Sequence, residues 1–411
     1  MINYNITIPE YIGERIVNGK LFLINQKKDE VWIYNNKSIQ LWEKVRNMEL
    51  LDELTENNKE LFLKSLYERG LINCDPVPQD FERKPNLVPY NRQFHMLYEI
   101  YKAHTLHNAM FEVTYRCNEK CSHCYISSVP DGELTFDEVT RVVDELKEMG
   151  CHLIHLTGGE IFCRKDIFDI IDYCQTQGFL IGLFTNGSLV TEEIADKISE
   201  RFISFVKISL YGTTQQSHEC ITKVKGSFEK SMNAIQLLKN RGQEVSVGFT
   251  LMKHNAKELY EADEFCDKLG VKYNIEMRIF PRHDNSNIPL EYAASDEDVK
   301  LFLREKRIST ITETICLAGQ TKMKINPSGD IYPCEFWRYP VGNVREKSLI
   351  DIWNSDELKA IVDKIRNYRP DECRSCELQK DCFVCPAFYD FEESGFSKEF
   401  CRWANLNAVD I

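Results

Sequence analysis

The stretch CNEKCSHC, residues 117–124, decides how the rest of this 411-residue chain is interpreted. It carries three cysteines in one loop, directly after the apolar run Phe111–Tyr115, which predicts a β-strand. The carboxyl end of such a strand is where α/β barrels place their chemistry. Three closely spaced thiolates can hold three irons of a cubane iron–sulfur cluster, and the missing fourth leaves one iron open to a ligand. The alternative is a zinc site, although tetrahedral structural zinc takes four ligands.

Strand and helix patterns alternate on the carboxyl side of Met110. Short apolar runs and longer amphipathic segments follow one another, which predicts an α/β fold with a parallel sheet, either doubly wound or an open barrel. The expected strands are 111–115, 153–156, 180–184, 205–210, 245–251 and 273–278, and the expected helices are 135–149, 166–177, 191–199, 227–241 and 255–268.

The sequence TGGE, residues 157–160, follows the second expected strand. Glycine permits a close approach of the backbone to a ligand, and a carboxylate suits an ammonium group. Together with the spacing of the three cysteines, this motif resembles the radical S-adenosylmethionine (radical SAM) superfamily, which implies a partial (β/α)6 barrel and S-adenosylmethionine as cofactor. The resemblance implies that the methionyl amino group meets Gly158, Gly159 and Glu160. It also implies that the catalytic [4Fe–4S] cluster is held by Cys117, Cys121 and Cys124.

Four further residues occupy positions that resemble cofactor contacts of that family. His123 stands where relatives carry an aromatic side chain near the adenine. Asn186 and Ser209 end the third and fourth expected strands, where relatives contact the ribose or the carboxylate, and Arg278 ends the sixth. Ordinary structural roles are the alternative: a partly buried histidine, polar caps at strand ends and an ion-pair partner.

Seven more cysteines form an ordered array in the C-terminal part, with Gly329 between the first two. They are Cys316, Cys334, Cys373, Cys376, Cys382, Cys385 and Cys401. The array resembles the SPASM domain of peptide-modifying radical enzymes, and one of its short spacings is one residue shorter than that domain's pattern. Two structural zinc sites are the alternative, because paired C-x2-C units are also zinc-ribbon spacing.

The SPASM resemblance implies two auxiliary [4Fe–4S] clusters, and therefore three clusters in all. The ligands implied for the distal cluster are Cys373, Cys376, Cys382 and Cys401, and those implied for the proximal cluster are Cys316, Cys334 and Cys385. Residues 305–315 contain no cysteine that would complete the proximal set. One hypothesis is an iron open to a substrate thiolate, since soft sulfur is a preferred ligand of such clusters. A non-cysteine ligand or a remote cysteine is the alternative.

Residues 1–74 predict a winged-helix-like α+β module. Arg15–Asn25 and Glu30–Tyr34 are β-rich runs, and helical patterns follow at 38–46, 50–56 and 59–70. The order resembles the PqqD-like element of peptide maturases, which captures a leader peptide as an added strand. The candidate groove is formed by the second strand with Ile39 and Trp42, and the alternative is that these side chains are core residues.

The remaining boundaries follow from composition. Residues 75–106 are rich in proline and charge and predict a bridging segment. Residues 107–300 are expected to form the barrel, and residues 301–411 are expected to form the SPASM domain.

A net charge of −13 argues against nucleic acid as a partner. The N-terminus lacks a signal-peptide pattern and no run of about 18 apolar residues occurs, so we expect no membrane partner and a cytoplasmic protein. Six cysteines outside the motifs predict buried apolar groups, namely Cys74, Cys151, Cys163, Cys174, Cys220 and Cys266.

The two resemblances together imply a peptide-modifying enzyme. One electron from a donor such as flavodoxin or ferredoxin enters the first cluster, and a 5′-deoxyadenosyl radical abstracts hydrogen from a precursor peptide that carries a leader sequence. The favoured product is a thioether between a cysteine sulfur and a carbon. A carbon–carbon crosslink or a side-chain oxidation by the same chemistry is the second hypothesis. A zinc-binding peptide adaptor without catalysis is the third.

Overall fold

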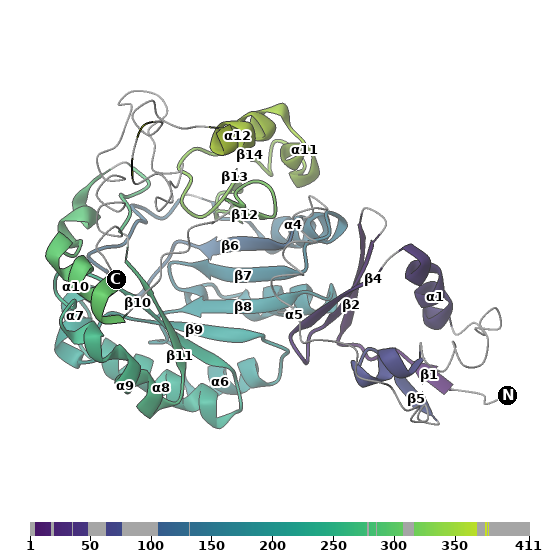
Figure 1. Cartoon of the computed structure of the whole chain (residues 1–411), viewed down its shortest axis with the longest axis horizontal. Helices are drawn as coiled ribbons and strands as arrows, with labels where there is room; N and C mark the ends of the chain where they lie inside the picture. Colours follow the sequence, from purple (N-terminus) through teal and green to yellow (C-terminus); the bar gives the residue numbers. More distant parts are fainter. Residues whose placement is uncertain are drawn as a thin grey trace.

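The computed structural model describes residues 5–17, 20–34, 36–47, 63–75, 106–130, 132–277, 279–284, 286–306 and 316–367, together with residues 375 and 377. These residues form a large α/β part, an α+β module beside it and a C-terminal group of short strands and helices (Figure 1). Within these ranges, no helix is long and apolar enough to cross a membrane. The predicted bridging segment lies almost entirely outside them.

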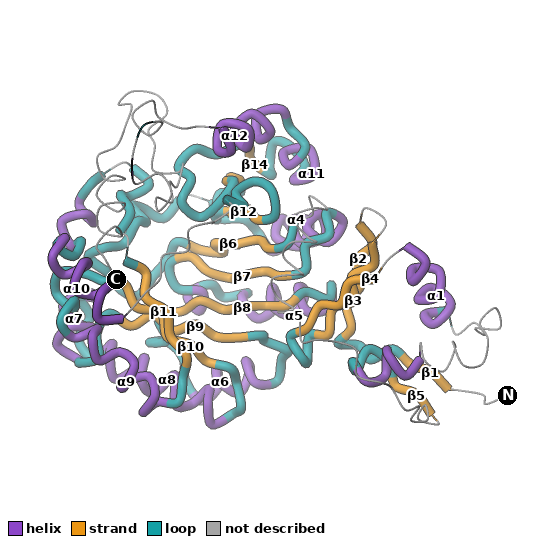
Figure 2. The backbone as a smooth tube through the Cα atoms, viewed as in Figure 1, coloured by secondary structure: helices purple, strands orange, loops and turns teal. Residues whose placement is uncertain are grey.

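A nine-stranded sheet forms the centre of the molecule, with the strand order β11-β10-β9-β8-β7-β6-β12-β13-β14 (Figures 1 and 2). Six strands are parallel to their sequence neighbours: β6 (Asn108–Thr114), β7 (Leu153–Gly158), β8 (Leu180–Thr185), β9 (Phe205–Leu210), β10 (Val245–Thr250) and β11 (Lys272–Glu276). Each one overlaps a strand expected from the apolar runs. The predicted six-stranded βα arrangement is therefore confirmed.

Helices connect these parallel strands. They are α4 (Phe136–Glu148), α5 (Ile167–Thr176), α6 (Glu192–Ser199), α7 (Gln215–Thr222), α8 (Ser227–Asn240), α9 (Ala262–Leu269) and α10 (Asp296–Lys306), with short 3-10 turns at η1 (Ile161–Cys163), η2 (Glu258–Glu261) and η3 (Ile288–Tyr292). Thr135 and Glu138 form a reciprocal capping box that begins α4. Helix α7 was not predicted, because the residues that it buries include the polar His218 and Thr222 rather than an apolar stripe.

The two faces of the sheet differ in chemistry. In β9, Val206, Ile208 and Leu210 are fully buried in the core between sheet and helices, whereas Lys207 and Ser209 are half-buried on the opposite side. Alternate residues of a strand point to opposite faces, and the register of the sheet places charged and polar residues of β6, β7 and β12 on the side of Lys207, together with the apolar Met110, Phe184 and Phe205. We call the second side the polar face. It carries Glu112, His155, Lys207, Ser209 and Lys324.

The C-terminal part extends the same sheet. Strand β12 (Lys322–Ile325) pairs in parallel with β6, and β13 (Asp330–Tyr332) and β14 (Gly342–Asn343) follow in antiparallel pairing. Gly329 turns the chain between β12 and β13 with φ +88°, and a Cβ there would lie 2.9 Å from Val344 Cγ2. Helices α11 (Leu349–Trp353) and α12 (Asp356–Asn367) complete the described residues. The C-terminal part is thus fused to the barrel at β6.

The N-terminal module is α+β, as predicted. It contains β1 (Asn5–Thr7), β2 (Ile12–Val17), β3 (Lys20–Asn25), β4 (Glu30–Tyr34), α1 (Asn36–Arg46), a helical turn at 63–68 and β5 (Asn73–Asp75). The β-rich run predicted at Arg15–Asn25 contains parts of two strands, because the segment folds back on itself: β2 and β3 pair antiparallel, and β4 pairs with β3. The helix expected at 50–56 lies outside the described residues.

Buried polar contacts dock this module on the barrel. Arg15 is 3% exposed, and its guanidinium donates to the backbone carbonyls of Cys151 and Gln177, each at 3.0 Å. Burial lowers the pKa of Arg15 to about 10. A Cβ on Gly13 would lie 2.3 Å from the carbonyl oxygen of Gly178, so the two backbones are in close contact. The docking surface lies at the amino ends of β7 and β8, opposite the cysteine loop.

The cysteines outside the motifs divide into two groups. Cys74, Cys151, Cys174 and Cys266 are buried, as predicted. Cys163 is half-buried and Cys220 is exposed on α7, so the prediction is wrong for Cys220 and holds in part for Cys163.

Candidate functional site

The loop of residues 117–124 is held in place by the end of helix α7. The amide of Lys120 donates to the Thr222 carbonyl and the amide of Ser122 donates to the Ile221 carbonyl, each at 3.0 Å. These bonds join the loop after the first strand of the barrel to the helix after its fourth strand. Tertiary structure therefore fixes the position of the three cysteines.

Polar groups surround the thiols of this loop. The Glu119 amide donates to Cys117 Sγ at 3.4 Å, and Asn186 Nδ2 lies 3.9 Å from the same sulfur. The Cys121 thiol donates to Glu119 Oε2 at 3.5 Å, and burial together with the nearby Cys121 raises the pKa of the Tyr211 hydroxyl. Cys117 is exposed, but partial desolvation of its thiol raises its pKa to about 11, and burial raises the pKa of Cys121 well above its usual value.

The donor set of this loop, three thiols close enough for their charges to act on one another, fits an iron–sulfur cluster. In the part of the chain that the structure describes, no group of three or more His, Cys, Asp and Glu side chains converges as one metal ion requires. A cubane cluster carries its irons at separate corners, so its thiolates stand farther apart than the ligands of one ion. Raised pKa values keep the thiols protonated at neutral pH, and a bound positively charged metal would displace those protons.

Both glycines of the TGGE motif are required by the end of strand β6. Gly158 has φ +135°, and a Cβ there would lie 2.1 Å from the Thr114 carbonyl oxygen. A Cβ on Gly159 would lie 2.5 Å from the Arg116 carbonyl oxygen. Larger side chains would therefore push away the segment that leads into the cysteine loop. The predicted cofactor contact of these two glycines stays a prediction.

Glu160 is fully buried and ties two strand ends together. Its carboxylate accepts hydrogen bonds from the Thr185 hydroxyl (2.7 Å), the Asn186 amide (2.7 Å) and the Phe162 amide (3.2 Å). Burial raises the pKa of this carboxyl, while the three donors oppose that rise. The predicted contact with an ammonium group is untested, but the structure holds the carboxylate firmly beside the third strand end.

The other predicted cofactor residues lie at the same edge of the sheet. Asn186 Nδ2 donates to Asn118 Oδ1 at 2.9 Å, within the cysteine loop. The His123 ring lies edge-on to Tyr211, with ring centres 4.6 Å apart, and burial lowers the pKa of His123 to about 4. Ser209 is half-buried on the polar face. Arg278 lies outside the described residues.

Sequence reasoning missed several residues that complete this site. They are Glu112, Tyr115, Glu119, Tyr125 and Tyr211. The strand pattern held a signal for Glu112, because a carboxylate inside the apolar run of β6 requires buried partners. Tyr115 and Tyr125 supply them, each donating a hydroxyl to Glu112 at 2.8 Å.

The second cysteine set is described in part. Cys316 is half-buried and Cys334 is 5% exposed, and both belong to one apolar cluster with Ala318 and Trp337. The ammonium of Lys322 lies near both sulfurs. It forms a bidentate ion pair with the two carboxylate oxygens of Glu335, at 2.9 and 3.0 Å. The structure thus brings the first two predicted proximal ligands together. The other predicted ligands, Cys373, Cys376, Cys382, Cys385 and Cys401, lie outside the described residues.

The two cysteine sites lie at opposite ends of strand β6. The first loop follows its carboxyl end, whereas Cys316 and Cys334 flank Lys322, which pairs with Asn108 at the amino end. At about 3.3 Å per residue, the length of the strand separates the two sites by roughly 20 Å. The polar face of the sheet extends between them.

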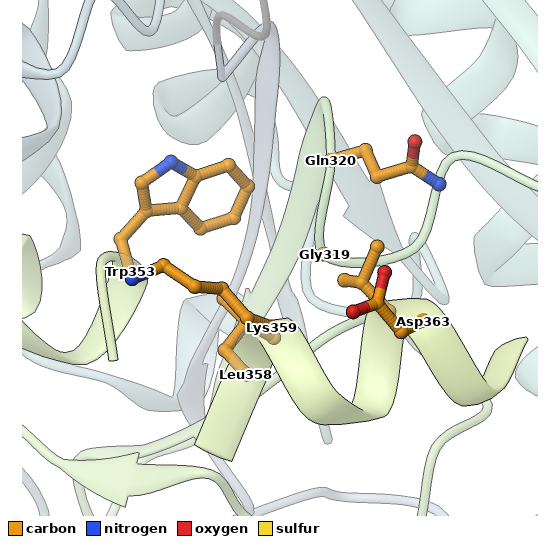
Figure 3. A pocket seen from close by; sticks show the side chains of 7 residues that line it. Gly319, Gln320, Trp353, Leu358, Lys359 and Asp363 are labelled. Carbon is orange, nitrogen blue, oxygen red and sulfur yellow. The ribbon is translucent and has the colours of Figure 1, made fainter. Parts of the chain in front are cut away.

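A pocket of about 420 Å³ lies beside the second site, between the turn that follows Cys316 and helices α11 and α12 (Figure 3). Gly319 and Gln320 line it from the turn, Trp353 lines it from α11, and Lys359 and Asp363 line it from α12. Gln320 donates from Nε2 to the Cys316 carbonyl at 2.8 Å, so this wall is tied to a predicted cluster ligand. The pocket borders the C-terminal part and not the loop of residues 117–124.

Comparison with protein families agrees with the two cysteine motifs. Residues 111–266 match the model of the radical SAM superfamily, and residues 316–377 match an iron–sulfur cluster-binding domain, SPASM. The chain has a radical SAM fold joined to a SPASM domain. Such domains imply S-adenosylmethionine and [4Fe–4S] clusters as cofactors.

Three relatives illustrate the range of similar proteins. The AdoMet-dependent heme synthase of Methanosarcina barkeri is 28% identical over 320 residues, which cover 67% of this chain and 90% of that protein. The antilisterial bacteriocin subtilosin biosynthesis protein AlbA of Bacillus subtilis is 28% identical over 330 residues, which cover 74% of this chain and 72% of that protein. Streptococcus suis SuiB bound to precursor peptide SuiA aligns with a TM-score of 0.61 at 18% identity, covering 92% of this chain and 94% of that chain.

The structural match to SuiB covers more of this chain than the sequence match to the heme synthase does. A 92% match leaves out fewer residues than the 74 of the predicted N-terminal module, so the fold likeness to SuiB includes part of that module. The match to the heme synthase leaves a third of this chain uncovered. The domain arrangement therefore follows the peptide-bound structure over more of the chain.

Proposed function

We propose that this radical SAM enzyme modifies a ribosomally made precursor peptide and joins a cysteine sulfur of that peptide to a carbon atom. The observation that carries the proposal is the position of two cysteine sites at opposite ends of β6, with one polar face between them. A peptide in extended conformation spans roughly 20 Å with about six residues. A short substrate segment on this face would reach both sites.

The residues at the carboxyl edge would hold the cofactors. Cys117, Cys121 and Cys124 would ligate the first cluster, with Glu160 and Asn186 beside the open corner. When bound, the cluster and S-adenosylmethionine supply a carbon radical that removes a hydrogen atom from the substrate. The protein orients the substrate carbon, and buried groups around the loop exclude water. A small electron donor such as flavodoxin or ferredoxin would deliver the electron.

Cys316 and Cys334 would hold part of the proximal auxiliary cluster, together with Cys385. We propose that an iron of this cluster takes the substrate thiolate, since iron has a high affinity for soft sulfur. Bond formation would then join two atoms of one bound peptide: the thiol would lose its proton on binding, and the electron left over when the carbon radical bonds to sulfur would pass to the auxiliary cluster. The support is the absence of a cysteine in residues 305–315 and the half-exposure of Cys316.

The N-terminal module would capture the leader peptide. Its sheet has the order β2-β3-β4, and β2 carries the Arg15 and Gly13 contacts to the barrel, which leaves β4 at the other edge. An added strand on β4 would gain main-chain hydrogen bonds. Trp42 is 2% exposed and donates to Glu14 Oε2 at 2.7 Å, so it belongs to the core and not to the groove.

A second candidate is the synthesis of a heme-type small molecule, as the name of the AdoMet-dependent heme synthase of M. barkeri states for that protein. The 28% sequence identity to that protein favours a small-molecule substrate for the barrel and the SPASM domain. The N-terminal module argues against it, because the match covers 67% of this chain. A carbon–carbon crosslink or a side-chain oxidation of a peptide is the other alternative within the same chemistry.

The test is anaerobic reconstitution followed by assay with candidate precursor peptides. We expect three [4Fe–4S] clusters by iron and sulfide analysis, 5′-deoxyadenosine formation, and a peptide product lighter by two hydrogen atoms. Alkylation of free thiols then separates the readings: a thioether product has lost one reactive cysteine, whereas a carbon crosslink retains it. Deletion of residues 1–74 should weaken leader binding but spare uncoupled cofactor cleavage. Unchanged leader affinity would contradict the role of the module.

The open-iron proposal has its own test. Spectra of the reduced auxiliary clusters should change when a cysteine-containing precursor is added, and should not change with a serine-substituted precursor. Identical spectra with both peptides would contradict a bond between iron and the substrate sulfur and would favour the carbon-crosslink reading.

A further inference from the structure

A buried ion pair lies on the polar face next to the cysteine loop. Glu112 on β6 is 1% exposed and Lys324 on β12 is 2% exposed, and Lys324 Nζ lies 3.8 Å from Glu112 Oε2. The hydroxyls of Tyr115 and Tyr125 each donate to the same carboxylate at 2.8 Å. The ammonium of Lys324 also lies 4.3 Å from the ring centre of Tyr332.

This pair connects the C-terminal part of the chain to the first cysteine site. Tyr125 directly follows Cys124, so one hydrogen bond links Glu112 to the residue beside a predicted cluster ligand. Lys324 comes from the strand that the SPASM part adds to the barrel. Burial raises the pKa of the Cys124 thiol and the charge of Glu112 adds to that rise, so the carboxylate of the pair lies close enough to act on this sulfur.

Stability alone does not explain why the pair is present. Removing two charges from water is costly, and apolar residues of similar volume pack such positions as well or better. The hydroxyl donors make the site a satisfied polar network, which fixes its members in one arrangement. A fixed charge beside a redox centre changes its reduction potential, because reduction adds negative charge to the cluster.

We propose that the Glu112–Lys324 pair sets the reduction potential of the cluster held by Cys117, Cys121 and Cys124, and so couples this cluster to the docking of the SPASM strand β12. The inference rests on the proposed cluster assignment. Glu112 opposes reduction and Lys324 favours it, so the two charges act with opposite signs. Loss of contact between β12 and β6 would leave the carboxylate without its cation and make the cluster harder to reduce.

The test is a redox titration monitored by electron paramagnetic resonance, in which the first cluster is recognised by the change that S-adenosylmethionine causes in its signal. Glu112→Gln should shift the midpoint potential upward, and Lys324→Met should shift it downward. The double variant should return close to the wild-type value. The matched control is the exposed pair Lys272–Glu244 in the same sheet, 2.9 Å apart, where Lys272→Met and Glu244→Gln should cause no shift.

The outcomes separate this inference from the proposed function. Shifts of the same sign in both single variants, or no shift, would overturn the inference and leave the function intact. A wild-type protein whose cluster signals ignore S-adenosylmethionine would overturn both. If a variant does not retain the cluster, Tyr125→Phe takes its place with Tyr332→Phe as control, because it removes one donor from Glu112. A downward shift in Tyr125→Phe alone supports the pair, and an unchanged potential contradicts it.

Discussion

The two ends of the central sheet consist of the same strands but use their polar side chains differently. At the carboxyl end, Glu160 bonds the Thr185 hydroxyl and the Asn186 amide, and Asn186 reaches the cysteine loop. At the amino end, Arg15 and Gln26 donate to backbone carbonyls of the barrel, Gln26 at 2.9 Å to Gln175 and Phe179. The contacts at the carboxyl end therefore fix side chains around the cysteine loop. The contacts at the amino end fix the N-terminal module on the backbone of the barrel.

This difference separates the groups that position the first cysteine site from the groups that hold the N-terminal module on the barrel. Substitutions at the carboxyl end should reduce cofactor cleavage more than stability, because the groups there position a ligand. Substitutions at the amino end should reduce stability and leave cleavage unchanged in the protein that stays folded. The predictions below test the division from the largest expected effect to the smallest.

The largest effect is expected from the first cysteine loop. Replacing Cys117, Cys121 and Cys124 together with alanine should abolish formation of 5′-deoxyadenosine and remove one cluster, while the auxiliary iron remains. The readouts are product quantification by chromatography and iron analysis. The control at the amino end is Cys151→Ala, a buried cysteine outside the motifs that should retain cleavage. If the triple variant cleaved the cofactor at the wild-type rate, the radical site would lie elsewhere.

The second largest effect is expected at Glu160, whose carboxylate accepts hydrogen bonds from Thr185 and Asn186 at the end of β8. Glu160→Gln places an amide group among three hydrogen-bond donors, so we expect the edge to shift and the cleavage rate to fall by about 100-fold. Circular dichroism should show a folded protein. The control is Glu133→Gln at the same edge, because Glu133 accepts from the Thr114 hydroxyl and the Tyr115 amide but lies outside the motif. Equal losses in both variants would mean that Glu160 acts as a structural residue alone.

The barrel was largely predictable from the sequence because its signals are local. Apolar runs alternate with amphipathic segments, and the six strands and five predicted helices all occur. The cysteine loop, the TGGE motif and the strand-end Asn186 are brought to one edge because parallel strands all end there. The two cysteines Cys316 and Cys334 also meet as expected.

Most of the features that were missed depend on contacts between distant segments. The reversal between β2 and β3 is the exception, because Asn18-Gly19 is the dipeptide typical of a two-residue hairpin turn and already predicts the antiparallel pairing. The role of Glu112 depends on Lys324, which is 212 positions away and meets it through the pairing of β6 with β12. Tyr211 and Glu119 support the cysteine loop through single contacts that leave no spacing pattern.

The docking arginine at the amino end gives a prediction of stability. Arg15→Ala leaves the carbonyls of Cys151 and Gln177 without this donor in a buried interface, which should cost about 2–4 kcal/mol of unfolding free energy. Urea unfolding measures the change. Arg46→Ala is the control, because its ion pair with Glu14 is largely exposed and contributes about 0–1 kcal/mol. A loss of cleavage in folded Arg15→Ala protein would break the division between the two ends.

The smallest effect is expected at the ion pair between Glu138 and Arg345, which joins helix α4 to the C-terminal part at 2.7 Å. Hydrogen bonds from Arg345 and from the Thr135 cap lower the pKa of Glu138 from its ordinary 4.5 to about 2. A lowered pKa stabilises the folded state above pH 4.5, and this contribution is lost as the pH falls through about 2. Glu138→Gln should therefore cost about 1 kcal/mol at pH 7, and urea unfolding should show a smaller difference at pH 3. A difference that is constant with pH would mean that the cap and not the charge supplies the stability.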